Sequence, residues 1–262
     1  MEFYTDQIGH IFELHEAPKR VISLVPSQTE FLNDLGLDEQ IIGITKFCVH
    51  PKEWFKRKQR VGGTKTLNLE LIRSLNPDLI IANKEENNRP DIEALQKEFC
   101  VWTSDIKTTK DSYQMMIALG KIFEKEEMAN AIVKKITSNF TILRSQNFTK
   151  KSALYLIWHE PIMSVGHDTY IHEILNIAGF ENVLKTHTRY PILSLNAIQE
   201  FAPDVLLLSS EPFPFKEKHI AFYQEALPNT KIKLVDGEIF SWYGSRQLKV
   251  KEYVLKLRKE LS

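Results

Sequence analysis

The sequence predicts an α/β fold of two lobes, each built on a parallel sheet and joined by one long, rigid α-helix. Three observations support this prediction. Strand-sized apolar runs alternate with helical segments along the 262 residues, which is typical of parallel α/β sheets. One residue pattern occurs twice, at 69–81 and at 195–207. Between the copies, residues 126–144 show the 3.6-residue apolar period of an amphipathic helix.

The repeated pattern combines leucine, isoleucine and a bulky apolar residue with Pro-Asp and three aliphatic residues. The two copies read LELIRSLNPDLII and LNAIQEFAPDVLL. Because proline does not continue a helix, each copy predicts a short helix, a Pro-Asp turn and a buried strand. The segments that flank the two copies are also similar, so we interpret the pattern as an internal duplication.

The first lobe is expected over residues 1–108. Ser27 and Glu30 match a capping box, which predicts the start of a helix, and Gly36 predicts its end. Besides the first copy of the repeat, we expect a hairpin or extended arm at 3–16, strands at 20–25, 41–45, 79–82 and near 101, an irregular segment at 46–66, and a helix at 91–98.

A helical linker is expected over residues 109–148, with helices at 111–123 and 126–144. Acidic residues lie at the N-terminus of the second helix and Arg144 lies at its C-terminus, as the helix dipole favours. A helix of about 20 residues is about 30 Å long, which is enough to connect two small domains. The apolar stripe that should be buried consists of Met128, Ala131, Ile132, Ile136, Phe140 and Leu143.

The second lobe is expected over residues 149–262. In parallel sheets, ligand-binding groups lie on the loops beyond the carboxyl ends of the strands, so these loops are the place to search for a site. Besides the second copy of the repeat, we expect strands at 153–158 and 231–235, a helix at 170–178 that ends at Gly179, and a closing helix from about 245.

Composition narrows the class of protein. With 34 basic and 34 acidic residues the formal charge is zero and no basic block exists, which argues against nucleic acid as a partner. The apolar runs are strand-sized and predict no transmembrane helix. Residues 1–10 lack a signal-peptide pattern, so we expect either a cytoplasmic protein or a removed leader. Cys48 and Cys100 suit a reduced compartment and leave one disulfide as an alternative.

Several short motifs are spread along the chain. They are Asp6-x-x-Gly9, the run from Lys19 to Ser27, Gly62-Gly63, Asn68-Leu-Glu70, the run from Ala178 to Val183, and Trp242. Together they resemble the class III solute-binding proteins of ABC importers, the helical-backbone metal receptors. The resemblance covers essentially the whole chain, and within that family the sequence is most similar to the vitamin B12 (cobalamin) binders.

The resemblance implies a monomeric, two-lobed binding protein for ABC-type import, and not an enzyme. It implies no intrinsic cofactor, a cargo such as cobalamin, haem or a ferric siderophore held between the lobes, and a periplasmic or other extracytoplasmic location. Family members that feed the B12 importer carry a glutamate on each lobe that docks to the permease. Glu70 matches the first of these, whereas Asn196 stands at the second position.

The loops after the predicted strands are rich in aromatic residues and carry a few polar groups. Such a lining suits a large, flat ligand, because apolar faces cover its ring and donors or acceptors contact its rim. Ordinary packing between loops is the alternative for each aromatic residue taken alone. The candidate ligand-binding residues are Phe47, His50, Asn83, Trp158, His159, Glu160, Met163, Tyr190, Glu211, Phe213, Trp242 and Tyr243.

His159 follows a predicted buried strand and is the candidate axial ligand to a metal, since neutral imidazole suits cobalt and iron. The alternative is a hydrogen-bonded loop histidine. With His50 and Glu160 it also defines a rival hypothesis, a cytoplasmic metal-binding enzyme or metallochaperone. No Cys-x-x-Cys or His-Glu-x-x-His spacing supports a zinc site, and no Gly-x-Ser-x-Gly elbow supports a hydrolase.

Overall fold

The computed structural model describes residues 2–261, so Met1 and Ser262, the ends of the two predicted lobes, lie outside it. Contacts between Cα atoms divide the chain into two compact units. Unit 1 holds the residues up to 106, 110–135 and 243–246, and unit 2 holds 107–109, 136–242 and the residues from 247 onward. The division into 1–108, 109–148 and 149–262 stays a prediction.

Unit 1 is built on a five-stranded parallel sheet with the strand order β5-β4-β3-β8-β9. Its strands are β3 (Val21–Ser23), β4 (Ile41–Ile44), β5 (Gln59–Arg60), β8 (Leu79–Asn83) and β9 (Val101–Ser104). Its helices are α1 (Pro26–Asp34), α2 (Lys52–Arg57), α3 (Leu69–Leu75), α4 (Arg89–Leu95) and most of α5 (Thr109–Ile122). Two hairpins complete it, β1 (Glu2–Thr5) with β2 (Ile11–Leu14) and β6 (Gly62–Gly63) with β7 (Thr66–Leu67).

Unit 2 contains a second sheet, in the order β11-β10-β13-β14, with β12 also paired to β10. Every pair is parallel except that of β10 with β11. The strands are β10 (Lys151–Trp158), β11 (Met163–Ser164), β12 (Phe180–Asn182), β13 (Val205–Ser209) and β14 (Lys231–Val235). The helices are α7 (Tyr170–Ile177), α8 (Leu195–Phe201), α9 (Glu217–Ala226), α10 (Gly237–Ser241) and α11 (Gln247–Glu260), while the short helix η1 (Gly244–Arg246) belongs to unit 1.

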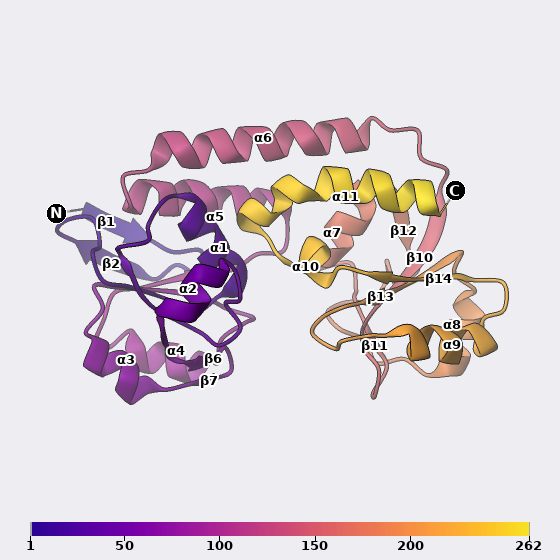
Figure 1. Ribbon diagram of the computed structural model, residues 1–262, viewed down its shortest axis with the longest axis horizontal. Coiled ribbons are helices and arrows are strands. Elements are labelled where there is room, and N and C mark those ends of the chain that lie inside the picture. The colour runs from indigo at the N-terminus through magenta and orange to yellow at the C-terminus, as the bar shows by residue number, and fades with distance from the viewer. Residues whose placement is uncertain (1, 262) are drawn as a thin grey trace. The chain divides into compact units, whose positions relative to one another are not determined.

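Helices cover both faces of the unit 2 sheet. Successive side chains of a strand point to opposite faces. Leu154 and Leu206 lie on one face and pack with Ile198 of α8 and Tyr223 of α9 in one buried cluster. On the other face, the ring of Tyr155 lies 5.2 Å from that of Phe240 in α10. Figure 1 shows α8 and α9 below the strands and α11 above them.

The two copies of the repeated pattern fold alike. In each, the helix is capped by a side-chain oxygen, that of Asn68 for α3 and of Ser194 for α8. Each helix ends on a left-handed residue, followed by Pro-Asp and a fully buried strand. These shared features confirm the predicted helix, turn and strand in both copies, and with the two parallel sheets they confirm the α/β fold class.

The aspartate of each Pro-Asp turn holds the start of the neighbouring strand. Asp78 Oδ2 accepts hydrogen bonds from the backbone N–H groups of Lys19 and Arg20, both at 2.9 Å, just before β3. Asp204 Oδ2 accepts from the backbone N–H and the hydroxyl of Ser152, at 2.7 and 2.8 Å, in β10. Each carboxylate therefore aligns the beginnings of two central, parallel strands.

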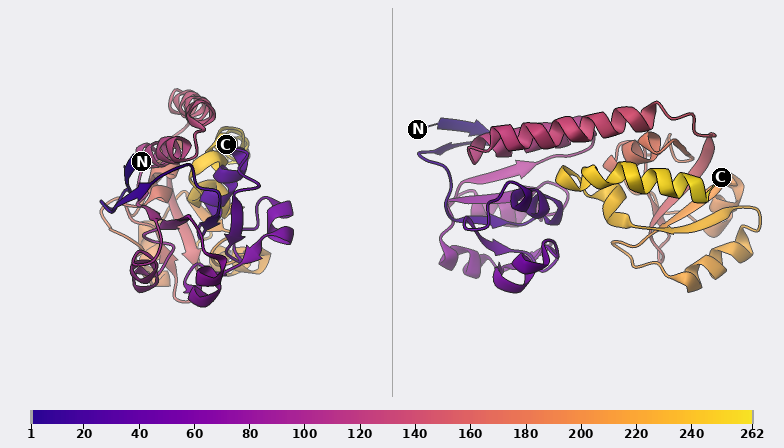
Figure 2. Two further views of the ribbon diagram at one scale, coloured as in Figure 1. Left: turned by 90° about the vertical axis from the view of Figure 1, so that its left-hand side faces the viewer. Right: turned by 45° about the horizontal axis from the view of Figure 1, so that its top comes forward.

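The long helix α6 (Glu126–Arg144) has 19 residues and contributes to both units. At 1.5 Å per residue it is roughly 28 Å long, and Figure 2 shows it as one unbroken helix. The predicted stripe is partly wrong. Met128 is 45% exposed and Ala131 is also exposed, while Ala129 is buried. Successive side chains point about 100° apart around a helix, so an apolar residue one position away from the buried stripe faces solvent.

Two other sequence predictions need correction. The capping box at Ser27 is wrong, because α1 begins at Pro26, after Val25, and has no side-chain cap. Glu30 instead accepts a hydrogen bond from Arg246 Nε at 2.7 Å, in a buried ion pair. The segment at 46–66 is not wholly irregular, since it contains α2 and short strands.

We expect Asp204→Ala to reduce the free energy of unfolding by about 1–2 kcal/mol, because two hydrogen bonds to a carboxylate are lost. Urea denaturation measures the difference. As a control, Glu93→Ala removes an exposed ion pair with Arg89 and should change stability by less than about 0.5 kcal/mol. Equal effects of the two substitutions would contradict the structural role of Asp204.

The contribution of Asp204 should also depend on pH. The hydroxyl of Ser152, and then its backbone N–H, lower the pKa of Asp204 from its ordinary value of 3.8. Stability from a lowered carboxyl pKa is present above that value and is lost as pH falls through the folded pKa. The difference between wild type and Asp204→Ala should therefore shrink in urea titrations below about pH 4.

Candidate functional site

In unit 1, the loop after β4 carries two of the predicted residues. Phe47 is 50% exposed, and the Lys46 ammonium lies 5.1 Å from the centre of its ring. His50 is half-buried. Cys48, between them, is fully buried, and its sulfur lies 3.1 Å from the Thr29 hydroxyl. The loop is therefore anchored by its cysteine and exposes an aromatic ring.

Asn83 ends β8, and its side chain organises the loop at 83–88. Its amide nitrogen donates to Ser104 Oγ at 2.9 Å, and its amide oxygen accepts from the backbone N–H groups of Glu85 and Glu86. The residue is only 3% exposed. We therefore leave Asn83 out of the lining that we propose below, and assign it a positioning role.

Tyr243, another predicted lining residue, is 7% exposed and belongs to unit 1 by its contacts. Its hydroxyl accepts a hydrogen bond from Gln28 Nε2 at 3.2 Å. Burial raises the pKa of Tyr243, followed by the nearby negative charge of Glu86. The phenol thus keeps its proton and forms part of a buried polar network with Gln28 and Ser104.

In unit 2, the predicted residues Trp158, His159 and Phe213 lie together. The Trp158 and His159 rings are each centred 5.7 Å from that of Phe213. Trp158 is 39% exposed, and its indole N–H donates to the backbone oxygen of Glu160 at 3.0 Å. The carboxyl end of β10 and the loop after β13 therefore form one aromatic surface.

Sequence reasoning missed four residues of this surface. Phe215 follows Phe213 in the same loop, and His219, Phe222 and Tyr223 come from α9; all four have ring centres within 6.2 Å of that of His159. A usable signal was present, because residues three and four apart share a face of a helix. The spacing of His219, Phe222 and Tyr223 therefore indicates an aromatic helix face.

Glu211 and Trp242 contact each other. Glu211 Oε1 accepts from Trp242 Nε1 at 2.8 Å and from the Ser241 hydroxyl at 2.6 Å. Trp242 is 7% exposed, whereas Glu211 is half-buried. The pair links the loop after β13 to the end of α10, so both residues have a structural role in unit 2.

The remaining predicted residues lie on strand β11 and on two loops of unit 2. Glu160 is exposed, and Met163 is half-buried and pairs with Ile192 across an isolated β-bridge. The Arg189 guanidinium lies 5.4 Å from the centre of the Tyr190 ring. The bridge brings β11 beside the loop that precedes α8.

The titratable groups do not form a metal centre of their own. Across residues 2–261, no group of three or more His, Cys, Asp or Glu side chains is placed to hold a metal ion. Both cysteines are free thiols, so the disulfide alternative is not realised. Burial raises the pKa of the Cys48 thiol, which keeps it protonated and a poor nucleophile.

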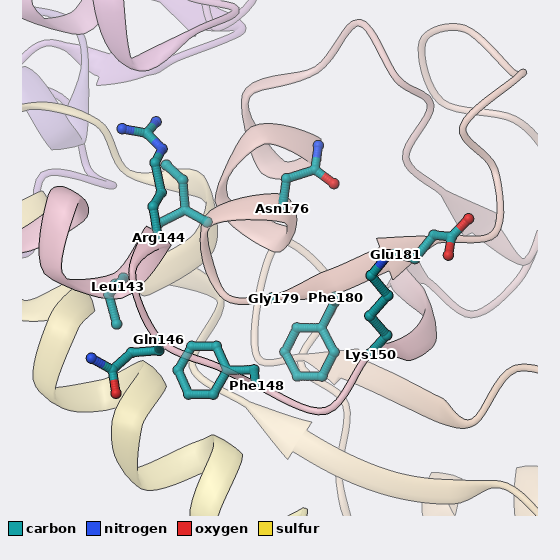
Figure 3. Close-up of a pocket in the computed structure, with 10 residues that line it drawn as sticks. Leu143, Arg144, Gln146, Phe148, Lys150, Asn176, Gly179, Phe180 and Glu181 are labelled. Atoms are coloured by element: carbon teal, nitrogen blue, oxygen red, sulfur yellow. The ribbon is translucent and has the colours of Figure 1, made fainter.

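A separate hollow of about 450 Å³ lies at the opposite end of the unit 2 sheet (Figure 3). Its wall includes Phe148, Lys150 and Phe180, next to the amino ends of β10 and β12. The eight residues of β10 separate this hollow from Trp158 by roughly 26 Å. Buried Arg258 packs behind it, with its guanidinium 4.9 Å from Phe148 and 4.6 Å from Phe180. None of the predicted ligand-binding residues lines it.

A sequence profile of the family described as periplasmic binding protein matches residues 21–234. The chain belongs to this family. It is 27% identical over 205 residues to an uncharacterized ABC transporter substrate-binding lipoprotein, YvrC, of Bacillus subtilis strain 168, covering 74% of this chain and 64% of that protein. It is 29% identical over 201 residues to a vitamin B12-binding protein of Vibrio vulnificus strain CMCP6, covering 75% and 73%.

Solved structures share the fold. The periplasmic vitamin B12 binding protein BtuF of Vibrio cholerae superimposes with a TM-score of 0.79 at 22% identity, covering 94% of this chain and 98% of that one. The periplasmic heme-binding protein BhuT, in complex with two hemes, gives 0.80 at 20% identity, covering 93% and 99%. The family match and the two related sequences confirm the resemblance to the solute-binding proteins of ABC importers, and the solved structures confirm the fold.

Membership of the periplasmic binding protein family also confirms the prediction of a binding protein rather than an enzyme. The rival hypothesis of a metal-binding enzyme receives no support from this family. Within residues 2–261, no helix combines the length and the apolar character needed to cross a membrane.

The stability of the folded protein should decrease in acid because of His219, which lies in the aromatic surface of unit 2. Burial, and then the neighbouring His159, lower the pKa of His219 from its ordinary value of 6.5. The unfolded chain therefore takes up a proton at this site before the folded chain does, so stability falls as pH drops below about 6.5. We expect the urea midpoint to decrease between pH 7.5 and 5.5, and less so in His219→Gln.

His15→Gln is the matched control for this prediction, because the His15 side chain is 74% exposed. Its pH dependence of stability should equal that of the wild type. A His219→Gln variant with the full acid destabilisation of the wild type would contradict the role assigned to His219 and would leave His172, whose pKa burial also lowers, as the other candidate.

Proposed function

We propose that this protein is the extracytoplasmic solute-binding component of an ABC-type importer and that its cargo is a corrinoid or a related metal chelate. The observation that carries the proposal is the family match over residues 21–234, with vitamin B12-binding proteins among the relatives. The lipoprotein and periplasmic names of related proteins support a location outside the cytoplasm.

The surfaces at the strand ends support a cargo with a large apolar ring. Each unit exposes aromatic or aliphatic side chains there: Phe47 in unit 1 is 50% exposed, and Ile192 and Phe222 in unit 2 are 65% and 45% exposed. Covering such side chains on binding is favourable by about 25 cal/mol per Å² of apolar area. Haem and ferric siderophores remain alternative cargoes, because related structures include heme and hydroxamate systems.

We propose ligand-contacting residues for each unit by itself. In unit 1 they are Phe47 and His50. In unit 2 they are Trp158, His159, Glu160, Met163, Tyr190 and Phe213, together with the exposed Ile192 and Phe222, whereas Glu211, Trp242 and Tyr243 have supporting roles within their own units. Polar groups are few, so affinity would come from ring burial, and specificity from a small number of hydrogen bonds at the rim.

Titration with cyanocobalamin, and separately with haem, tests the proposal by calorimetry and visible absorbance. We expect at least one of them to bind with one-to-one stoichiometry. Trp158→Ala should weaken binding about tenfold, because an aromatic contact is lost. Phe3→Ala, at a phenylalanine that is 69% exposed on the β1–β2 hairpin, should leave affinity unchanged. No binding of either chelate at high micromolar concentration would contradict a corrinoid or haem cargo.

We also propose that Glu70 docks to a permease. It is exposed at the second position of α3. Asn196 is exposed at the second position of α8, so each residue follows a capping residue and a first-turn leucine. A carboxylate there suits a basic partner surface, and a neutral amide gives only weak attraction. Docking would thus depend mainly on unit 1.

Glu70→Lys should therefore reduce association with the permease in lipid nanodiscs, while the affinity for the chelate stays unchanged. Asn196→Glu should strengthen the association by adding a second acidic contact. Biolayer interferometry at low and high salt measures both effects. If Glu70→Lys binds the permease as the wild type does, the docking role is wrong.

A further inference from the structure

The hydrogen bond between His159 and Tyr223 determines which nitrogen of the imidazole carries the proton. His159 Nδ1 lies 3.0 Å from the Tyr223 hydroxyl. Tyr223 is fully buried, and burial raises its pKa, so the hydroxyl keeps its proton. Among residues 2–261, His159 Nδ1 is the one hydrogen-bond partner of that hydroxyl. A buried O–H group needs an acceptor, so Tyr223 donates to Nδ1.

Because His159 Nδ1 accepts this hydrogen bond, only one tautomer of the neutral imidazole is compatible with it. The Nδ1 lone pair is engaged by the Tyr223 hydroxyl, and the ring proton therefore sits on Nε2. A metal ligand needs a nitrogen with an available lone pair, and this tautomer offers none.

We infer that His159 presents its Nε2–H group as a hydrogen-bond donor to a carbonyl or carboxylate oxygen on the rim of the ligand, and does not coordinate a metal. The inference rests on the proposed function, because it assigns a role within the same site. It replaces the axial-ligand hypothesis for His159 by its alternative, a hydrogen-bonded histidine, and gives that histidine a part in specificity.

The neighbouring His219 has the same tautomer for a firmer reason. The backbone N–H of Lys216 donates to His219 Nδ1 at 2.8 Å, and a backbone amide nitrogen can only donate. The proton of neutral His219 is thus also on Nε2. The two imidazoles meet edge to face with centres 4.9 Å apart, and a positive charge on either would disfavour one on the other. The Nε2–H group of neutral His219 is therefore also a hydrogen-bond donor.

Aromatic rings fix the orientation of the His159 imidazole. The ring meets Phe222 edge-on at 5.2 Å and lies 5.7 Å from Phe213, while Tyr223 holds its Nδ1 side. His159 itself is half-buried rather than enclosed. A donor that is already oriented loses little conformational entropy on binding, which favours a ligand with an acceptor at one defined position on its rim.

The tautomer can be tested without any ligand. Long-range proton–nitrogen NMR of the histidine rings in the ligand-free protein should show His159 with Nε2 protonated and Nδ1 unprotonated. In Tyr223→Phe, which removes the donor and keeps the ring, the Nδ1–H form should gain population. A predominantly Nδ1–H ring in the wild type would overturn the inference.

Binding measurements test the role of the donor. We expect His159→Phe to weaken cyanocobalamin binding about tenfold and His159→Gln, which keeps an N–H donor, to weaken it less than about threefold. The control is His15→Phe, at a side chain that is 74% exposed on unit 1, which should bind as the wild type does. Equal losses in His159→Phe and His159→Gln would overturn the inference.

Haem binding distinguishes a His159 that donates a hydrogen bond from a His159 that coordinates the iron. The visible spectrum of bound ferric haem should be the same in the wild type and in His159→Gln, because no imidazole–iron bond is broken by the change. A spectrum of histidine-ligated iron that is lost in His159→Gln would overturn the inference. If neither chelate binds the wild-type protein, the proposed corrinoid or haem cargo is wrong, whereas the NMR spectrum still decides the tautomer.

Discussion

The carboxylate at the head of each repeated strand is the constraint on which the rest of the structure depends. Asp78 and Asp204 each accept two hydrogen bonds from the segment that begins the adjacent parallel strand. Because the starts of the two parallel strands are aligned, their carboxyl ends lie at the same edge of the sheet. The loops that follow the strands therefore lie side by side at that edge. The position of the candidate site in each unit follows from this alignment.

Most polar groups of the predicted site form hydrogen bonds within their own unit. The amide of Asn83 holds the loop after β8, the carboxylate of Glu211 holds Trp242, and Tyr223 occupies one nitrogen of His159. Such networks fix loops in one conformation, because an unpaired buried polar group would be costly. What remains exposed is largely aromatic, and this is the surface expected of a protein that binds a broad apolar ring.

The sequence predicted the features that depend on local chemistry. Pro-Asp turns, the helix stops and the long helix α6 follow from backbone rules that act over a few residues. It failed where tertiary packing overrides local preference. Ser27 has the residue type of a cap, yet α1 starts one residue earlier, and Glu30 is used for a buried ion pair with Arg246. A partner 216 residues away leaves no trace in the local pattern.

The candidate site could be predicted only in part, and the reason lies in the repeat itself. The duplicated pattern fixes equivalent helices and strands in the two units, but it ends with β8 and β13, and the loops beyond those strands differ completely. After β8 come a lysine, two glutamates and two asparagines, at 84–88, and after β13 come Glu211, Phe213 and Phe215. Two similar scaffolds therefore carry loops of different chemistry. The loops must therefore select the ligand, because the repeated helix, turn and strand are the same in both units and determine only the scaffold.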